Sequence, residues 1–225
     1  MRNILVTGGF GVLGRAVAAS FCDAGDRVAR IDFATARPDS NPGGLDLGGI
    51  DLTDLDAAER VVGKVQSEWG GIDVLINVAG GFTWQTLESG GPEIWQKMYA
   101  MNTLTCVNMT KAALPTLSAT PGAAIINIGA GSALVAAAGM GAYAASKSAV
   151  HKLTESLAAE LAAADCTVNA VLPGIIDTPA NRADMPDADF STWVRPSAIA
   201  QLILFLASPA ARSITGALIP VTRGA

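Results

Sequence analysis

Short apolar runs alternate with amphipathic stretches along the whole chain. Continuous apolar runs predict buried strands, and apolar residues spaced three or four apart predict helices. On this basis we expect strands at 4–7, 27–32, near 50, 73–77, 123–128, 166–172 and 217–221, and helices at 13–24, 54–69, 92–114, 142–164 and 196–207. Pro115 should end the third helix, and the Pro- and Gly-rich segment 34–49 should be a loop.

Strands that alternate with helices require crossover connections. The chain is therefore expected to form an α/β fold with a mostly parallel, doubly wound sheet and helices on both faces. No repeat or change in composition divides the sequence, so residues 1–225 are predicted to be a single domain. Sheets of this kind bind ligands beyond the carboxyl ends of their strands, and every motif discussed below follows such an end.

Charge and cysteine content narrow the function classes. The net charge is −5 and no basic stripe is present, so we expect no nucleic-acid partner. No apolar run is long enough to span a membrane, and the first residues enter a strand directly, which favours a cytoplasmic protein without a membrane partner. Three scattered cysteines and a lone His151 predict no metal site.

The segment TGGFGVLG (residues 7–14) joins the first strand to the first helix. Glycines at this turn let a pyrophosphate approach the backbone, and the helix N-terminus offers unpaired N–H groups to it. A simple turn is the alternative, but the strand–turn–helix context favours a dinucleotide site.

Asp32 ends the second strand, 18 residues after Gly14, near the spacing expected for an acid that binds the adenosine ribose. A carboxylate accepts hydrogen bonds from ribose hydroxyls and repels a 2′-phosphate, so NAD(H) is favoured. The neighbouring Arg15, Arg30 and Arg37 leave NADP(H) as an alternative. A solvated acid at the strand end is the other interpretation of Asp32.

Two further strand ends complete the predicted cofactor groove. Asp51, followed by Leu52, could face the adenine or could serve equally well as an acid near the start of the next helix. The segment NVAG closes the fourth strand with Asn77, Ala79 and Gly80, and its small residues would let a cofactor pass close to the backbone.

Tyr143 and Lys147 lie four residues apart near the start of a predicted helix, and hence on one face of it. A lysine ammonium about 5 Å from the phenol would lower the tyrosine pKa by about two units at an effective dielectric of about 20. Tyr143 is therefore a candidate acid/base. The alternative is a tyrosine packed in the core beside a solvated lysine.

Together, the glycine turn, NVAG, Asn102, YAASK (143–147), Pro173-Gly174 and Thr178 resemble the short-chain dehydrogenase/reductase family. The resemblance spans essentially the whole chain and implies a Rossmann-type fold and an NAD(P)-dependent oxidoreductase. It implies that Tyr143 is the acid/base, that Lys147 lowers its pKa, that Asn102 holds a water in the proton path and that Thr178 bonds the nicotinamide carboxamide. The cofactor residues it implies are Gly8, Phe10, Gly11, Leu13, Gly14, Asp32, Asp51, Leu52, Asn77, Ala79, Gly80, Tyr143, Lys147, Pro173, Gly174, Ile176 and Thr178.

One position departs from the family pattern. The substrate-orienting serine usually lies 13 residues before the tyrosine, where this chain has Ala130, and Ser132 is the nearest hydroxyl. The segments AGGF (79–82), GMGAY (139–143) and 171–193 also resemble the dihydropteridine reductases, which lack this serine and prefer NADH. That resemblance implies reduction of a dihydropterin-like ring, with a carbonyl or alcohol as the alternative substrate.

Substrate contacts are expected from the loops after the fourth, fifth and sixth strands, with Ser132, Trp84 and Met140 as candidates. His151 is expected at the surface or at an interface. Because the family commonly pairs helices across dimer axes, a homodimer or homotetramer is expected. The competing function is a non-catalytic redox sensor that binds NAD(H), a hypothesis motivated by the missing serine.

Overall fold

The computed structural model describes residues 1–35, 39–41 and 43–224. Within them, one sheet contains seven strands, all paired in parallel, in the order β3-β2-β1-β4-β5-β6-β7. The strands are β1 (Asn3–Thr7), β2 (Arg27–Ile31), β3 (Leu45–Leu47), β4 (Val74–Asn77), β5 (Ala123–Ile128), β6 (Cys166–Pro173) and β7 (Leu218–Val221). The predicted doubly wound α/β fold is confirmed.

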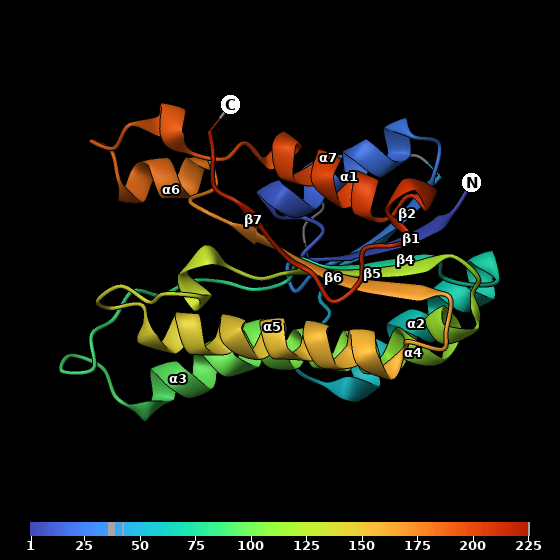
Figure 1. Ribbon diagram of the computed structural model, residues 1–225, viewed down its shortest axis with the longest axis horizontal. Helices are drawn as coiled ribbons and strands as arrows, with labels where there is room; N and C mark the ends of the chain where they lie inside the picture. Colours follow the sequence, from blue (N-terminus) through green and yellow to red (C-terminus); the bar gives the residue numbers. More distant parts are fainter. Residues whose placement is uncertain (36–38, 42, 225) are drawn as a thin grey trace.

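Helices cover both faces of this sheet (Figure 1). One layer consists of α1 (Val12–Asp23) and α7 (Pro196–Leu206), and the other of α2 (Leu55–Trp69), α4 (Thr105–Ala119) and α5 (Gly141–Glu160). The shorter helical segments are α3 (Pro92–Met98), η1 (Tyr99–Leu104), η2 (Gly131–Ala133), α6 (Pro179–Asp184), η3 (Phe190–Thr192) and η4 (Pro209–Ala211). Side chains that alternate along a strand feed both cores, with Ile4 and Val6 facing α1 and α7 and Leu5 facing α2 and α4.

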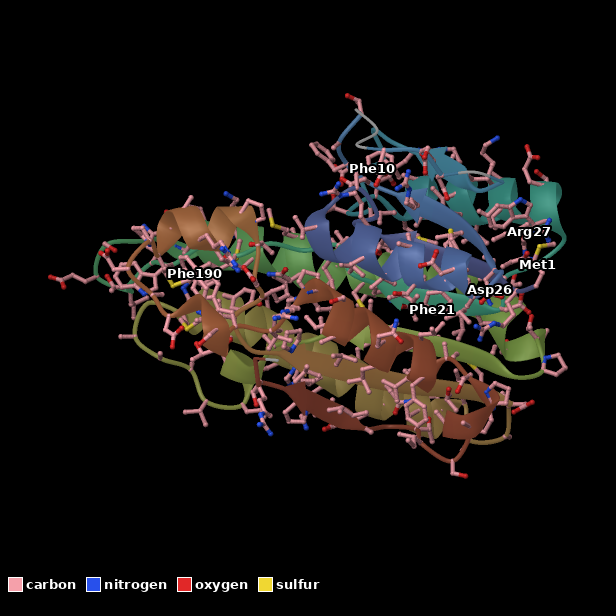
Figure 2. The ribbon with its side chains drawn as sticks, turned by 90° about the horizontal axis from the view of Figure 1, so that it is seen from above. Met1, Phe10, Phe21, Asp26, Arg27 and Phe190 are labelled. Atoms are coloured by element: carbon pink, nitrogen blue, oxygen red, sulfur yellow. The ribbon has the colours of Figure 1, made fainter. Side chains whose placement is uncertain are left out.

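The parallel arrangement brings all the strand ends that carry motifs to one end of the molecule. Met1 and Arg27 lie at the end where β1 and β2 begin, and Phe190 lies near the opposite end (Figure 2). The sheet order reverses at β1, which pairs with β2 on one side and β4 on the other. Such a switch point is where sheets of this class bind ligands.

The third strand differs from its prediction. It is β3, inside the segment expected to be a loop, and Ile50 lies outside it. Asp46 in the middle of β3 accepts hydrogen bonds from Arg30 on β2, so its polar side chain is compatible with a strand. Residues 36–38 and 42 of the predicted loop, including Arg37, lie outside the described residues.

The long helix expected over 92–114 is continuous but changes type at η1, a π-helical segment, and it does not end at Pro115. Proline removes the hydrogen bond to the carbonyl four residues earlier. That carbonyl belongs to Lys111, which is exposed, so water can satisfy it. The helix therefore continues to Ala119.

Candidate active site

A groove of about 2000 Å³ runs along the carboxyl ends of the strands. Typical small-molecule sites occupy about 300–1000 Å³, so this groove has room for a dinucleotide together with a second molecule. Nearly all the residues predicted for the site line it: Gly8, Phe10, Gly11, Leu13, Gly14, Asp32, Asp51, Leu52, Ala79, Gly80, Trp84, Ser132, Met140, Tyr143, Lys147, Pro173, Gly174, Ile176 and Thr178. Asn77 and Asn102 do not.

The glycine turn packs so closely that side chains are excluded from it. Gly8 has a φ of +63°, and a Cβ there would lie 2.9 Å from the backbone nitrogen of Ala79. A Cβ on Gly14 would overlap the carbonyl of Gly8. Thr7 fixes the neighbouring strand end, because its hydroxyl accepts hydrogen bonds from the N–H groups of Val78 and Ala79. The turn therefore brings bare backbone to the floor of the groove.

The start of α1 is suited to an anion. Gly11 is the N-cap residue and provides no side-chain hydrogen bond, and the first turn contains no acidic residue. The unpaired N–H groups and the positive end of the helix dipole therefore face the groove without a competing carboxylate.

Asp32 lies directly after β2 and is held by the backbone. Its carboxylate oxygens accept hydrogen bonds from the N–H groups of Phe10 and Ala34, at 2.9 and 3.0 Å. Each oxygen keeps a free lone pair, so the side chain retains the capacity to accept from ribose hydroxyls. The nearby Arg30 does not offset this negative charge, because it is paired with Asp39 and Asp46.

Asp51 does not end a strand, because β3 stops at Leu47. Its carboxylate accepts from the N–H and the hydroxyl of Thr53, which lowers its pKa, while Asp54 is the N-cap of α2. The backbone of Leu52 is fixed by the side-chain amide of Asn108. The groove wall here is an ordered turn that presents Asp51 to solvent.

Tyr143 and Lys147 project from the first turns of α5 into the groove. The ring of Phe82 meets the Tyr143 ring edge-on, with centroids 5.0 Å apart. Lys147 is buried, and its Nζ donates to the carbonyl oxygen of Ile128 at 2.8 Å. A Cβ on Gly80 would lie 2.5 Å from the amide oxygen of the buried Asn102, so a glycine fits best at this position next to Lys147.

Burial dominates the protonation of both groups. It raises the pKa of Tyr143 to about 12 and lowers the pKa of Lys147 to about 8. The direction for Tyr143 is opposite to the one expected from the sequence, because desolvation disfavours the phenolate. At neutral pH the chain alone therefore holds a protonated phenol beside an ammonium.

Asn102 lies in η1 and is almost completely buried. Its amide oxygen accepts from the N–H of Gly81, and its amide nitrogen donates to the Gly81 carbonyl and to the hydroxyl of Ser146. The side chain therefore ties the loop after β4 to α5. Asn77 is likewise turned into the core, where it donates to Thr110 and Asn127.

The loop after β5 contains the position at which the family serine is expected. Ala130 lines the groove there without a hydroxyl, and Ser132 lines it two residues later, in η2. His151 was expected at the surface, but its side chain is buried beneath this loop and accepts from the N–H of Ala130. The expectation that His151 lies at the surface or at an interface is wrong, because the backbone of the loop after β5 covers its side chain.

The loop after β6 closes the groove on the other side. Gly174 donates to the backbone of Val221, and Thr178 caps α6 by accepting from the N–H of Asn181. These hydrogen bonds thus fix the backbone of the loop that contains the predicted cofactor residues Pro173, Gly174, Ile176 and Thr178.

A wall of exposed apolar side chains flanks the catalytic end. Trp84, which donates from its indole nitrogen to Ala138, and Met140 were predicted there. Met185, in the segment 181–193 that was also expected to contact the substrate, lines the groove as well. Further lining residues were not predicted from the sequence: Phe33, Lys97, Met101, Leu134, Val135 and Ile175. Several are large apolar residues in loops directly after strand ends, a signal that could have identified them.

Several observations of this structure fit a dinucleotide in the groove: the bare glycine turn, the uncapped start of α1, the acid after β2 and the length of the groove from Asp32 to Tyr143. Among the described residues, no cluster of His, Cys, Asp or Glu suits a metal ion, and no helix is long and apolar enough to cross a membrane.

The sequence matches the short chain dehydrogenase family over residues 2–189, and the chain belongs to this family. It is an NAD(P)-dependent oxidoreductase. It is 31% identical to the 3-oxoacyl-(acyl-carrier-protein) reductase FabG of Thermotoga maritima, over 98% of this chain and 96% of that protein. It is 28% identical to the D-beta-hydroxybutyrate dehydrogenase of Cupriavidus necator, over 96% of this chain and 95% of the relative.

A solved structure of a dehydrogenase has the same fold as this chain. The ligand-free aldohexose dehydrogenase of Thermoplasma acidophilum superposes with a TM-score of 0.90 at 27% identity, covering 99% of this chain and 93% of that one.

Proposed function

We propose that the chain transfers hydride between NAD(H) and a small substrate, with Tyr143 as the proton donor or acceptor. The observation that carries the proposal is the placement of Tyr143 and Lys147 on one face of α5, at the end of the groove opposite Asp32. The nicotinamide ring, when bound, supplies or accepts the hydride. The chain's own residues orient the two molecules and move the proton.

The protonation of the pair supports reduction of the substrate. With a pKa raised to about 12, Tyr143 remains a phenol across the neutral range and is ready to donate its proton. Lys147 carries most of its charge at neutral pH and stabilises the phenolate left behind. Asn102 contributes by fixing Gly81 beside this pair, as a positioning residue.

NAD(H) is preferred in this proposal. Asp32 leaves lone pairs for ribose hydroxyls, and the charge of Arg30 is already neutralised. Gly8, Gly11, Gly14, Ala79 and Gly80 would bind the dinucleotide through backbone approach, and Pro173, Gly174, Ile176 and Thr178 would enclose its nicotinamide half.

The substrate we propose is a small, flat ring of the dihydropterin type. Trp84, Met140 and Phe82 provide an apolar wall, and Ala130 offers no hydroxyl to an alkoxide. Reduction of a conjugated imine develops its charge on nitrogen and forms no alkoxide, so it does not need such a donor. The named relatives act on carbonyl or alcohol groups, so a ketone is the second candidate, with Ser132 as the hydroxyl that would orient it.

A homodimer or homotetramer remains our prediction for the assembly. Trp95 of α3 and Tyr99 of η1 are 41% and 52% exposed, which supports an interface along this helical segment. Light scattering of the purified chain tests it.

The test of function combines turnover with binding. NADH consumption is followed with quinonoid dihydropterin and with a panel of ketones, and NADPH is assayed in parallel. Tyr143→Phe should reduce turnover by about 10²–10⁴-fold while NADH affinity stays near that of the wild type. Tyr99→Phe is the matched control, because Tyr99 lies outside the groove. Full activity of Tyr143→Phe would refute the assignment, and NADH binding without turnover of any substrate would favour the redox sensor.

A further inference from the structure

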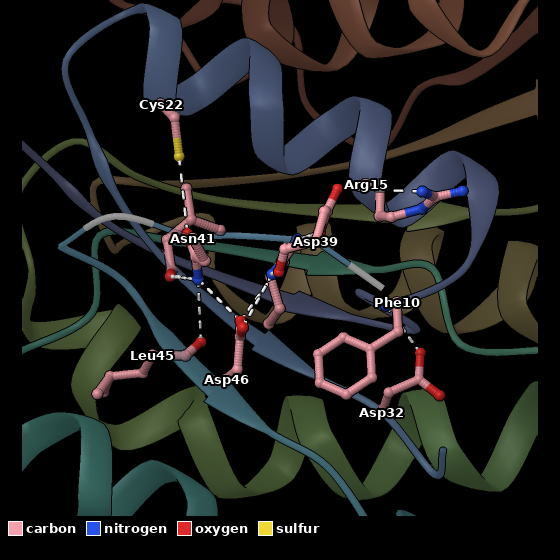
Figure 3. Close-up of polar contacts among 10 residues, drawn as sticks. Phe10, Arg15, Cys22, Asp32, Asp39, Asn41, Leu45 and Asp46 are labelled. Carbon is pink, nitrogen blue, oxygen red and sulfur yellow. Dashed lines mark hydrogen bonds and ion pairs between the residues drawn. The ribbon is translucent and has the colours of Figure 1, made fainter. Parts of the chain in front are cut away.

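Arg30 is a buried cation near the adenosine end of the groove, and its charge is neutralised by two aspartates. It lies on β2 with only 3% of its surface exposed. Its Nε and Nη2 donate to the two oxygens of Asp46 at 2.8 Å, and its Nη1 donates to Asp39 at 2.5 Å. Asn41 donates to the same Asp46 carboxylate, which completes the network (Figure 3).

A second arginine approaches the same acid from α1. Nη1 of Arg15 lies 4.0 Å from Asp39, whose side chain is 45% exposed. The Nε of Arg15 is buried and has no hydrogen-bond partner. In Figure 3, Asp39 lies between Arg15 on one side and Asn41 and Asp46 on the other. One partly exposed carboxylate thus neutralises part of the charge of two arginines.

The ring of Phe10 lies between the guanidinium of Arg30 and the groove. The backbone N–H of Phe10 donates to Asp32, and the guanidinium of Arg30 lies 5.7 Å from the centre of the Phe10 ring. Phe10 and Asp32 line the groove, whereas Arg15, Arg30 and Asp39 do not. Arg30 therefore lies one side chain away from the place where Asp32 would meet the adenosine ribose, and Arg15, whose side chain is 38% exposed, approaches the same Asp39 from α1.

We propose that Asp39 determines coenzyme specificity: by pairing with Arg15 and Arg30, it withholds their positive charge from a 2′-phosphate at the adenosine end of the groove. This inference rests on the proposed function, because it concerns the same groove. The two arginines and the two acids Asp39 and Asp46 carry equal and opposite charge. Among the described residues of this region, Asp32 then adds one negative charge that the two arginines do not offset, so a 2′-phosphate entering beside Asp32 meets an excess of negative charge there. Removing the charge of Asp39 leaves Asp46 to hold Arg30 and leaves Arg15 without its acid.

The test is calorimetric binding of NADH, NADPH, 5′-AMP and adenosine 2′,5′-bisphosphate to the full chain. Asp39→Asn keeps an oxygen that can accept from Arg30, so the fold should persist. NADPH and the bisphosphate should bind about tenfold more tightly than to the wild type, because a charge-assisted contact to phosphate becomes available. NADH and 5′-AMP should change by less than about threefold. The gain should shrink as salt is added.

Two control variants sharpen the result. Asp39→Glu keeps the charge and should keep the wild-type preference. Glu59→Gln changes the net charge equally at an exposed position of α2 and should leave NADPH affinity unchanged. Equal gains in Asp39→Asn and Glu59→Gln, no gain in Asp39→Asn, or wild-type NADPH binding as tight as NADH binding would overturn the inference. Failure of the wild type to bind NADH would instead refute the proposed function.

Discussion

The imidazole of His151 accepts a hydrogen bond at its Nε2 from the backbone N–H of Ala130, at 3.3 Å. One helical turn earlier, Lys147 donates to the carbonyl oxygen of Ile128. Two side chains of α5 thus hold the backbone at the end of β5 on either side of Gly129. A Cβ on Gly129 would overlap the imidazole, so a glycine is required between the two contacts.

This contact predicts a dependence of stability on pH. Burial and the neighbouring charge of Lys147 lower the pKa of His151 below its ordinary 6.5, with Lys152 acting in the same direction and Glu155 opposing it. Below pH 6.5 the unfolded chain binds a proton that the folded chain resists, so acidification through this range destabilises the fold. Urea unfolding should show a wild-type midpoint that falls between about pH 7.5 and about pH 5.5.

His151→Gln is the matched variant, because the glutamine oxygen can still accept from Ala130 and does not titrate. Its midpoint should be nearly constant over the same range. If the urea midpoints of the two proteins changed equally with pH, His151 would not have a lowered pKa in the folded chain.

The glycine turn gives a second prediction. Gly14→Ala places a Cβ against the Gly8 carbonyl, which is backbone and cannot rotate away. We expect a loss of about 1–3 kcal/mol in unfolding free energy, together with loss of dinucleotide binding. Gly63→Ala on α2 is the control, since nothing lies within 4 Å of the added methyl. That variant should gain about 0.5–1 kcal/mol from helix propensity. Equal effects of the two substitutions would mean that the turn is looser than described.

The positions of most strands and most of the residues that line the groove could be predicted from the sequence, because continuous apolar runs and glycine turns are local signals. It was insufficient for β3, where Asp46 breaks the apolar pattern and its partner Arg30 lies 16 residues away. It also missed the burial of His151, which depends on contact with the backbone of β5. Likewise, the inward direction of Asn77 and Asn102 depends on partners in distant segments.

Lys147 should make the free energy of unfolding depend on pH above neutrality. Its pKa is lowered to about 8 in the folded chain by burial, against an ordinary value of 10.5. Between these values the unfolded chain holds more protons than the folded chain, so stability rises with pH. Relative to Lys147→Met, the wild type should gain on the order of 1 kcal/mol from about pH 7 to about pH 9. Lys152→Met removes a side chain that is 77% exposed and should match the wild-type slope, as measured by urea unfolding. A wild-type slope equal to that of Lys147→Met would mean that the ammonium is hydrated in the folded chain.

Ala130→Ser restores a hydroxyl where the family has its substrate-orienting serine, and it separates the two candidate substrate classes. The Ala130 backbone is already extended and held by His151, so the new hydroxyl needs no rearrangement of the loop. A ketone develops negative charge on oxygen as hydride arrives, and a correctly placed donor should raise its reduction rate by about tenfold or more. Reduction of a dihydropterin-like imine develops no such oxyanion and should change by less than about threefold. Ser132→Ala is the companion variant, and it should slow ketone reduction only if Ser132 already supplies this hydrogen bond. Equal acceleration of both substrates by Ala130→Ser would show that the serine acts on Tyr143 and not on the substrate oxygen, and the missing hydroxyl would then no longer favour a ring imine over a ketone.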